Sequence, residues 1–353
     1  MRVELGEVCE RGSSNLKQSD VSKMNGKYPI YGASGYIGNV DFYHQDQPYV
    51  AVVKDGAGIG RTTLHPAKSS VIGTMQYLLP KENILPEYLF YVVKYMHLEK
   101  YFTGATIPHI YFKDYQHEEF NLDPIEKQVK IVTVLKKCEK IIDDRKKEMQ
   151  LLDDLIKARF VEMFGDVIHN DRKWECQQFS DITTSRLGKM LDTKHQTGTC
   201  KYPYLANFNV QWFRFELGNL NEMDFNEKER EEFCLEDGDL LVCEGGEIGR
   251  CAVWHNQIKK CFFQKALHRV RCNQDIILPD YLSWWFKYNC ENGGFTAIEG
   301  AKATISHLTG TKMKMLDVTV PPIELQEQFV DIIHQVDKSK VAVQKALDET
   351  QML

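Results

Sequence analysis

The chain lacks any long uninterrupted run of apolar residues, although 43% of its 353 residues are hydrophobic. No run approaches the ~20 apolar residues that a membrane-spanning helix needs. Two glutamates near the start, Glu4 and Glu7, interrupt the apolar core that a signal peptide requires. We therefore expect a cytoplasmic protein that forms ordinary hydrophobic cores and has no membrane partner.

The chain also lacks an excess of positive charge. Its 44 lysines and arginines are outnumbered by 50 acidic residues, and the net charge is −6. A protein that binds nucleic acid by itself usually carries a positive balance, because neutralising phosphates drives its affinity. The balance therefore argues against DNA binding by the bare chain. It permits local basic loops, or a complex in which a partner supplies the charge.

Paired cysteine motifs are absent. The ten cysteines are scattered without a Cys-x-x-Cys pair, and the spacings between Cys243 and Cys272 differ from those of common zinc sites. In a cytosolic protein such residues are usually reduced thiols. We expect no metal site and no bound cofactor.

Catalytic motifs are missing too. The chain has no Gly-x-Ser-x-Gly elbow, no His-Glu-x-x-His pair and no Asn-Pro-Pro-aromatic string of the kind that amino-methyltransferases use. The glycines between Gly56 and Arg61 lack the spacing of a nucleotide-binding loop, so we interpret them as a tight turn between strands. His109 and His307 recur without a recurrent acid partner and are interpreted as structural hydrogen-bonding residues. We predict no catalytic residue.

What the chain does contain is an internal duplication. The offset between the copies rises from 174 residues at the first string to 198 at the last, so the second copy is the first with insertions. Duplication on this scale predicts two similar domains and two similar binding events. The strings are Lys27-Tyr28-Pro29 and Lys201-Tyr202-Pro203, Ile59-Gly60-Arg61 and Ile248-Gly249-Arg250, and Pro-Ile-Glu-x-Gln at 124–128 and 322–326.

Each half combines short β-rich runs with helices. The runs at 49–53 and 76–79 have counterparts at 239–243 and 267–270. A proline followed by an acid and apolar residues, at Pro86 and again at Pro279, predicts the start of a helix.

A much longer helix follows in each half. No Pro or Gly interrupts the stretch between Pro124 and Phe164, which predicts a helix of about 40 residues that ends at Gly165. Its second copy begins at Pro322, keeps the register and reaches the end of the sequence about ten residues earlier. Two helices with matching seams most simply pair with each other; the alternative is that each packs on its own domain. The seam of the first helix is Ile131, Leu135, Cys138, Ile142, Met149, Leu152, Ile156 and Met163, and that of the second is Phe329, Ile333, Val336, Val343 and Leu347.

Polar and aromatic side chains gather in the segments that differ most between the halves. Such side chains suit contacts with base edges and phosphates, although they are also ordinary surface residues. Arg61 and Arg250 could read a base, hold a phosphate or pair with a neighbouring acid. The candidates are Tyr31, Ser34, Lys54, Arg61 and Lys113 in the first half, and Lys189, Asn207, Gln211, Arg250, Lys265 and Lys302 in the second.

The order of domain, long helix, domain, long helix resembles the specificity subunit of type I restriction–modification systems. The strings that carry the resemblance are Pro-Ile-Glu-x-Gln at 124–128 and 322–326, residues 151–155 with Phe164-Gly165, and Tyr28–Gly35. The resemblance implies a mixed α/β fold whose two target recognition domains, 1–123 and 166–321, are separated by two spacer helices, 124–165 and 322–353. We expect these helices to pair as an antiparallel coiled coil.

The resemblance also implies a non-catalytic role. Each recognition domain would read one half of a split sequence in double-stranded DNA, and the helices would dock two methyltransferase subunits. Whether restriction subunits join them stays open. Two other interpretations compete: a recognition part fused to a nuclease or methyltransferase, whose motifs are missing, and a tandem-domain scaffold that binds protein and no DNA.

Overall fold

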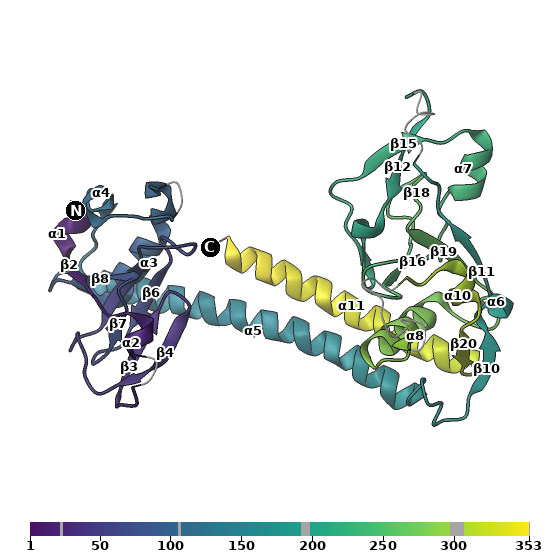
Figure 1. Cartoon of the computed structure of the whole chain (residues 1–353), viewed down its shortest axis with the longest axis horizontal. Helices are drawn as coiled ribbons and strands as arrows, with labels where there is room; N and C mark the ends of the chain where they lie inside the picture. Colours follow the sequence, from purple (N-terminus) through teal and green to yellow (C-terminus); the bar gives the residue numbers. More distant parts are fainter. Residues whose placement is uncertain (22–23, 105–106, 192–197, 297–306, 353) are drawn as a thin grey trace. The chain divides into compact units, whose positions relative to one another are not determined.

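The computed structural model describes residues 1–21, 24–104, 107–191, 198–296 and 307–352. It divides into two compact units, Met1–Asp143 with Thr350–Leu353, and Asp144–Glu349. Both units mix helices and strands, which confirms the predicted α/β class (Figure 1).

The first unit contains two main sheets. The larger has the strand order β2 (Cys9–Ser13), β8 (Met75–Pro80), β5 (Tyr49–Val53) and β6 (Thr62–His65), with every neighbouring pair antiparallel. The smaller has the order β4 (Gly35–Val40), β3 (Tyr28–Gly32) and β7 (Ser70–Val71). A further pair joins β1 (Arg2–Glu4) to β9 (Glu119–Asn121). The helices are α1 (Leu5–Val8), α2 (Gln18–Val21), α3 (Pro86–Tyr95), η1 (Leu98–Tyr101), α4 (Phe112–Tyr115) and the start of α5 (Ile125–Phe164).

The sequence of β5 explains its central place. Tyr-Val-Ala-Val-Val is apolar at every position and all five residues are buried, as expected of a strand covered on both faces. On one face Val50 and Val52 pack with Leu89 and Val93 of α3. Residues on the other face pack with Tyr77 of the neighbouring strand. The predicted runs at 49–53 and 76–79 are therefore confirmed as strands.

The second unit repeats this plan. Its larger sheet has the order β11 (Thr183–Leu187), β19 (Leu267–Cys272), β16 (Leu240–Cys243) and β17 (Cys251–Val253), and its smaller has β15 (Asn221–Asp224), β12 (Lys201–Leu205) and β18 (Phe262–Phe263). Two further pairs are β10 (Glu175–Gln178) with β20 (Asp317–Val320), and the hairpin of β13 (Val210–Gln211) and β14 (Arg214–Phe215). The helices are α6 (Phe179–Ile182), η3 (Asn207–Asn209), α7 (Glu227–Phe233), α8 (Pro279–Glu291), α10 (Gly310–Lys314) and α11 (Ile323–Gln351). The shared strand order confirms the duplication.

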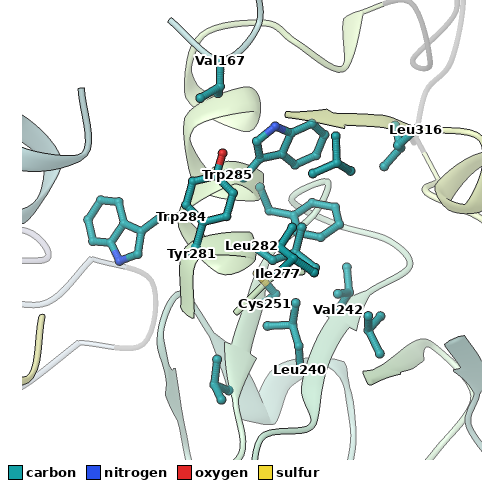
Figure 2. Packing of buried hydrophobic residues seen from close by; sticks show 14 of the residues in the cluster. Val167, Leu240, Val242, Cys251, Ile277, Tyr281, Leu282, Trp284, Trp285 and Leu316 are labelled. Atoms are coloured by element: carbon teal, nitrogen blue, oxygen red, sulfur yellow. The ribbon is translucent and has the colours of Figure 1, made fainter. Parts of the chain in front are cut away.

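The core of the second unit forms where α8 lies on the larger sheet. Tyr281, Leu282 and Trp285 of α8 pack in one cluster with Leu240 and Val242 of β16 (Figure 2). Proline at the first position of α8 suits a helix start, because the missing N–H would have no partner inside the helix.

Within this unit the end of α5 lies against α11. The ring centroids of Phe160 and Phe164 lie 5.5 Å and 5.3 Å from that of Phe329. Farther along, Lys340 Nζ lies 2.6 Å from Asp153 Oδ1. Residue numbers fall along α5 as they rise along α11, so the pair is antiparallel, as predicted. The predicted α11 seam, from Phe329 to Leu347, is buried.

The α5 seam departs from the prediction at its end. Phe160 and Phe164 are buried, whereas Met163, the last residue of the predicted seam, is only half-buried. A straight α-helix drifts relative to a seven-residue repeat, which moves the buried stripe on by one position. Gly165 then ends the helix at a φ of +73°. A Cβ there would lie 2.1 Å from Asp171 Oδ1, so the close approach also requires glycine.

Candidate nucleic-acid interface

In the first unit, Arg61 holds a neighbouring loop. It follows the turn between β5 and β6, which confirms the interpretation of those glycines. Its Nη1 donates a hydrogen bond of 2.8 Å to the carbonyl oxygen of Ala33, in the loop between β3 and β4. Gly60 in the turn has a φ of +79°, and a Cβ there would lie 2.6 Å from the backbone nitrogen of Glu99. The turn therefore needs glycine to bring Arg61 to this loop.

The loop held by Arg61 and the ends of the two strands that it joins carry exposed polar and aromatic groups. Ser34 is exposed, and so is Tyr36, whose hydroxyl donates to Asn39 Oδ1 at 3.1 Å. Tyr31 is half-buried, with its ring centroid 6.0 Å from that of Tyr36 and 4.4 Å from that of His65. Burial lowers the pKa of His65 to about 4, so this imidazole is neutral at pH 7. The exposed ring of Tyr36 is a surface on which a base could stack.

A second segment meets the same turn. The backbone N–H of Gly56 donates to the carbonyl oxygen of Pro108 at 2.9 Å. Beside it, His109 Nδ1 lies 2.7 Å from Asp55 Oδ1. The ring of His109 stacks near Tyr111, and Lys113 Nζ lies 5.5 Å from the centre of the Tyr111 ring. These contacts bring Lys113 and its neighbours to the turn that ends at Arg61.

The His109–Asp55 pair was missed from the sequence, because the partners are 54 residues apart. Among the described residues of the second unit, His307 makes no such pair with an acid. A Cβ built on Gly245 would lie 3.0 Å from Nδ1 of His307, so a glycine stands next to the second histidine. His109 therefore has an acid partner that the sequence did not predict, and the position equivalent to Asp55 by the offset of the Ile-Gly-Arg strings, 189 residues later, is Glu244. Lys54, next to Asp55 in the sequence, is half-buried with Nζ 3.9 Å from the Asp55 carboxylate.

The second unit repeats the arginine contact. Nη2 of Arg250 donates to the carbonyl oxygen of Asn207 at 3.1 Å and to its side-chain Oδ1 at 2.5 Å. Asn207 follows Ala33 by the same 174 residues that separate the first repeated strings. Asn207 in turn donates from Nδ2 to the carbonyl oxygen of Gly245 at 2.9 Å. The two arginines thus fasten equivalent loops to equivalent turns.

Lys189 and Lys265 lie next to each other but differ in surroundings. Lys189 Nζ lies 2.6 Å from Glu229 Oε2 and donates to the carbonyl oxygen of Asp224 at 2.6 Å. Its side chain is only 15% exposed, so its charge is already paired inside the unit. Lys265 is exposed, and its backbone N–H donates to the carbonyl oxygen of Lys189.

The hairpin of β13 and β14 belongs to the insertion that distinguishes the second unit. Gln211 Nε2 donates to the carbonyl oxygen of Phe208 at 3.0 Å. Phe213, in the turn, stacks on Trp284 of α8 with centroids 4.4 Å apart. The hairpin is therefore anchored to the helix layer, and half-buried Gln211 lies in its first strand. Lys302 lies outside the described residues.

No group of His, Cys, Asp or Glu in the described ranges is arranged to hold a metal ion. All ten cysteines are free, and burial raises the pKa of Cys9 to about 12, although Lys81 opposes the rise. Among the helices that the structure describes, none combines the length and the apolar character that crossing a bilayer requires.

The family described as the type I restriction modification DNA specificity domain matches residues 1–152 and 171–350, one stretch in each half. The chain belongs to this family. A putative type I restriction enzyme specificity subunit of Haemophilus influenzae is 20% identical over 344 residues, covering 94% of this chain and 85% of that relative. A type I restriction enzyme specificity subunit of Methanocaldococcus jannaschii is 26% identical over 124 residues, 30% of this chain and 29% of that relative.

Solved structures show the same fold. The S subunit of the type I restriction–modification system from M. genitalium gives a TM-score of 0.62 at 13% identity and covers 100% of this chain and 93% of its own. A second structure, from work on complex assembly and conformational transition of the type I system, gives 0.59 at 14% identity and covers 100% and 94%. Members of this family bind DNA and assemble with other restriction–modification subunits. This specificity subunit is accordingly a non-catalytic recognition subunit, as predicted.

Proposed function

We propose that each unit reads one half of a bipartite target in double-stranded DNA, with recognition domains at 1–123 and 166–321. The observation that carries this is the repeated arginine contact, Arg61 with Ala33 and Arg250 with Asn207. In each unit the arginine fastens an equivalent loop, but the side chains on the two loops differ. The same backbone arrangement with different side chains suits two different half-sites.

The side chains around each of these two loops fit contacts with bases and phosphates. Ser34 and the Tyr31–Tyr36 ring pair supply hydroxyls and stacking surface in the first unit, and Lys54 and Lys113 supply positive charge. In the second unit we assign base contacts to Asn207 and Gln211 and a phosphate contact to Lys265. Lys189 supports the strand beside Lys265 through its pair with Glu229. Because the net charge is −6, we expect partner subunits to add basic surface around the DNA.

We further propose that the two long helices, 124–165 and 322–353, act as spacers and dock two methyltransferase subunits. Beside the buried seam, α5 carries a second set of exposed apolar residues. In the first unit these are Val134 and Ile141, exposed by 58% and 45%, and in the second Leu151 and Leu155, exposed by 56% and 42%. Apolar residues in a row on a solvent-facing helix typify an interaction surface. Replacing Leu151 and Leu155 by glutamate should abolish co-purification of methyltransferase subunits, whereas Val161→Glu, at a position exposed by 40% on another face, should not.

The decisive test is an exchange of recognition domains. The chain is co-expressed with its methyltransferase subunits, and methylated adenines are mapped across the host genome. Replacing residues 1–123 by those of a relative with another target should change one half-site and leave the other unchanged. Changes in both half-sites would contradict the assignment of one half to each unit. Failure of the complex to retain any duplex in a sequence-dependent way would favour a protein-binding scaffold.

A further inference from the structure

Three segments of the second unit leave the smaller sheet at the same end. Strands β12 and β18 run side by side in parallel, and Lys189 forms a parallel bridge with the residue that follows β18. Because parallel strands end on the same side of a sheet, the chain continues past each of them at this end. The residues placed here are Met190 after the bridge, Lys265 after β18, and Asn207 and Phe208 after β12.

Two large apolar side chains at this end are exposed. Phe208 is 55% exposed and Met190 is 61% exposed. One exposed apolar side chain is ordinary on a protein surface. Here two stand on adjoining segments, and exposed Lys265 and half-buried Asn207 occupy the neighbouring positions. Apolar area with a polar rim typifies a surface that meets a partner.

The first unit forms the same end of its smaller sheet with polar residues. A backbone hydrogen bond of 2.8 Å runs from the N–H of Gly73 to the carbonyl oxygen of Leu16, and its counterpart in the second unit, accepted by Lys189, has the same length. The next residue in the first unit is therefore Lys17, which is exposed, where the second unit has Met190. A charged side chain in one unit thus stands in place of an apolar one in the other.

The position of Phe208 is polar in the first unit as well. The offset of 174 residues that relates the two arginine-held loops places Phe208 at Ser34, which is exposed. The exposed ring near that loop, Tyr36, has its hydroxyl bonded to Asn39. Both units have the same strand order, so the fold does not require apolar residues here. Their presence in one unit alone points to a contact with another molecule.

Hydrogen bonds fix the loop that carries Phe208. Asn209 is 1% exposed. Its Oδ1 accepts from the backbone N–H of Ala206 at 2.9 Å, and its Nδ2 donates to the carbonyl oxygen of Glu216 at 2.9 Å. The guanidinium of Arg250 fastens the residue before Phe208. A ring on a loop that is already fixed loses little conformational entropy when it binds.

We propose that Phe208, with Met190 beside it, is an apolar wedge that enters between two stacked bases of the half-site read by the second unit. This inference rests on the proposed function and adds to it the kind of contact that one domain makes. Proteins that unstack duplex DNA combine apolar wedges of this kind with lysine and amide side chains. Lys265 supplies the charge at the same end of the sheet. The first unit has polar residues in both places and should read its half-site without a wedge.

The experiment uses the chain assembled with its methyltransferase subunits on a duplex that carries its mapped target. Adenines in and beside each half-site are replaced one at a time by 2-aminopurine, whose fluorescence rises when it loses its stacking neighbours. The methylated adenines and their neighbours stay unsubstituted, because a methyltransferase takes its target base out of the duplex. We expect a rise of several-fold at one step of the second unit's half-site and none in the other half-site.

Variants of the ring assign the rise to its source. Phe208→Ala should abolish the rise and weaken binding of the target by at least about fivefold, because stacking of a base on an aromatic ring is lost. Phe208→Tyr keeps a flat ring and should keep the rise. The matched control is Met315→Ala, which removes an apolar side chain that is 71% exposed elsewhere in the second unit and should change neither quantity. Circular dichroism and thermal melting establish that all three variants are folded.

The outcomes separate the wedge from the proposed function. Fluorescence that does not rise in the second half-site, or a rise that Phe208→Ala leaves intact, would overturn the wedge. Loss of methyltransferase subunits from the Phe208→Ala complex would also overturn it, because the apolar area would then belong to a protein interface. The exchange of residues 1–123 tests the proposed function separately, since it reports which half-site changes and not whether bases unstack. One half-site per unit without unstacking would reject the wedge alone, whereas changes in both half-sites would reject the proposed function and the wedge with it.

Discussion

Gln128 and Gln326 make the same three hydrogen bonds in the two halves of the chain. Both side chains are fully buried. Each side-chain oxygen accepts a hydrogen bond from a backbone N–H at the start of a helix, α3 in the first half and α8 in the second. That N–H would otherwise have no partner. Each amide nitrogen donates to two backbone carbonyl oxygens. The partners are Leu85, Asn83 and Asp123 for Gln128, at 2.9, 2.9 and 2.7 Å, and Leu278, Ile276 and Pro321 for Gln326, at 2.9, 3.0 and 2.8 Å.

This pair gives the Pro-Ile-Glu-x-Gln string a physical reason. Gln128 joins the loop before α3 to the first turn of α5, and Gln326 joins the loop before α8 to the first turn of α11. We call this contact the glutamine clamp. Gln326→Leu removes all three hydrogen bonds and buries their partners unpaired. We expect the free energy of unfolding to fall by at least ~2 kcal/mol, because an unpaired buried group costs about 1–3 kcal/mol. Urea unfolding followed by tryptophan fluorescence measures it.

The matched control for the clamp is Gln344→Ala. Gln344 is an exposed glutamine on α11 that bonds only to Asp348 of the same helix. We expect the free energy of unfolding of Gln344→Ala to lie within about 0.5 kcal/mol of that of the unaltered chain. Equal stability of the two variants would show that the clamp contributes nothing.

A second prediction concerns Arg61. Because its guanidinium fastens the loop at Ala33, Arg61→Ala should cost about 1 kcal/mol in binding and relax recognition of one half-site only. Arg250→Ala should relax the other. Binding curves of the assembled complex on duplexes with single substitutions in each half-site provide the measurement. An even loss across all sequences with a shallower salt slope would instead indicate a phosphate contact.

The third prediction concerns how the stabilising effect of the Lys189–Glu229 pair depends on pH. Burial raises the pKa of Glu229, but the hydrogen bonds from Lys189 and the backbone of Asn226 outweigh it and lower the pKa overall. A carboxylate with a depressed folded-state pKa stabilises the fold above its unfolded pKa, and that contribution is lost as pH falls through the folded value. Lys189→Met should therefore destabilise the chain at pH 7, by about 1–3 kcal/mol for a partly buried pair.

The stability difference between the unaltered chain and Lys189→Met should shrink as pH falls below 4.5, the ordinary value for a glutamate. Unfolding in urea across this range measures it. A difference that stays constant with pH would mean that Lys189 does not act through Glu229. If instead the variant lowers the salt slope of DNA binding by one phosphate without losing stability, Lys189 is a direct DNA contact.

The sequence predicted those features that depend on local pattern or on repetition. The apolar run of β5 and the uninterrupted helix of α5 are visible in their own residues, and comparison of the copies predicted the buried seam of α11. Contacts between distant residues could not be predicted in this way. Arg61 finds its carbonyl 28 residues away, and Lys189 finds its carboxylate 40 residues away. Arg61 and Lys189 were both chosen as DNA-contact candidates by residue type, and only the fold shows the internal partners of each.

The last prediction is that the length of the long helices sets the distance between the two half-sites. We call this the ruler hypothesis. Helix α5 has 40 residues, a rod of roughly 60 Å at 1.5 Å per residue. If the half-sites are read by separate domains, several unread base pairs should lie between them. Inserting four residues after Met149 lengthens the helix by ~6 Å, which corresponds to about two base pairs of DNA. The gap should change by that amount while both half-site sequences stay the same. The insertion also rotates the following seam by ~40°, so we expect some loss of stability.

The control places the same four residues after Asn256, which is exposed in the loop between β17 and β18. That variant should keep both half-sites and the original gap, because the helix is unchanged. Mapping methylated adenine in cells that carry each folded, active variant decides between the outcomes. An altered half-site with an unaltered gap would refute the ruler. The loop insertion separates the effect of added length in the helix from the effect of adding four residues anywhere in the chain. A changed gap in the helix variant alone therefore assigns the spacing of the target to α5.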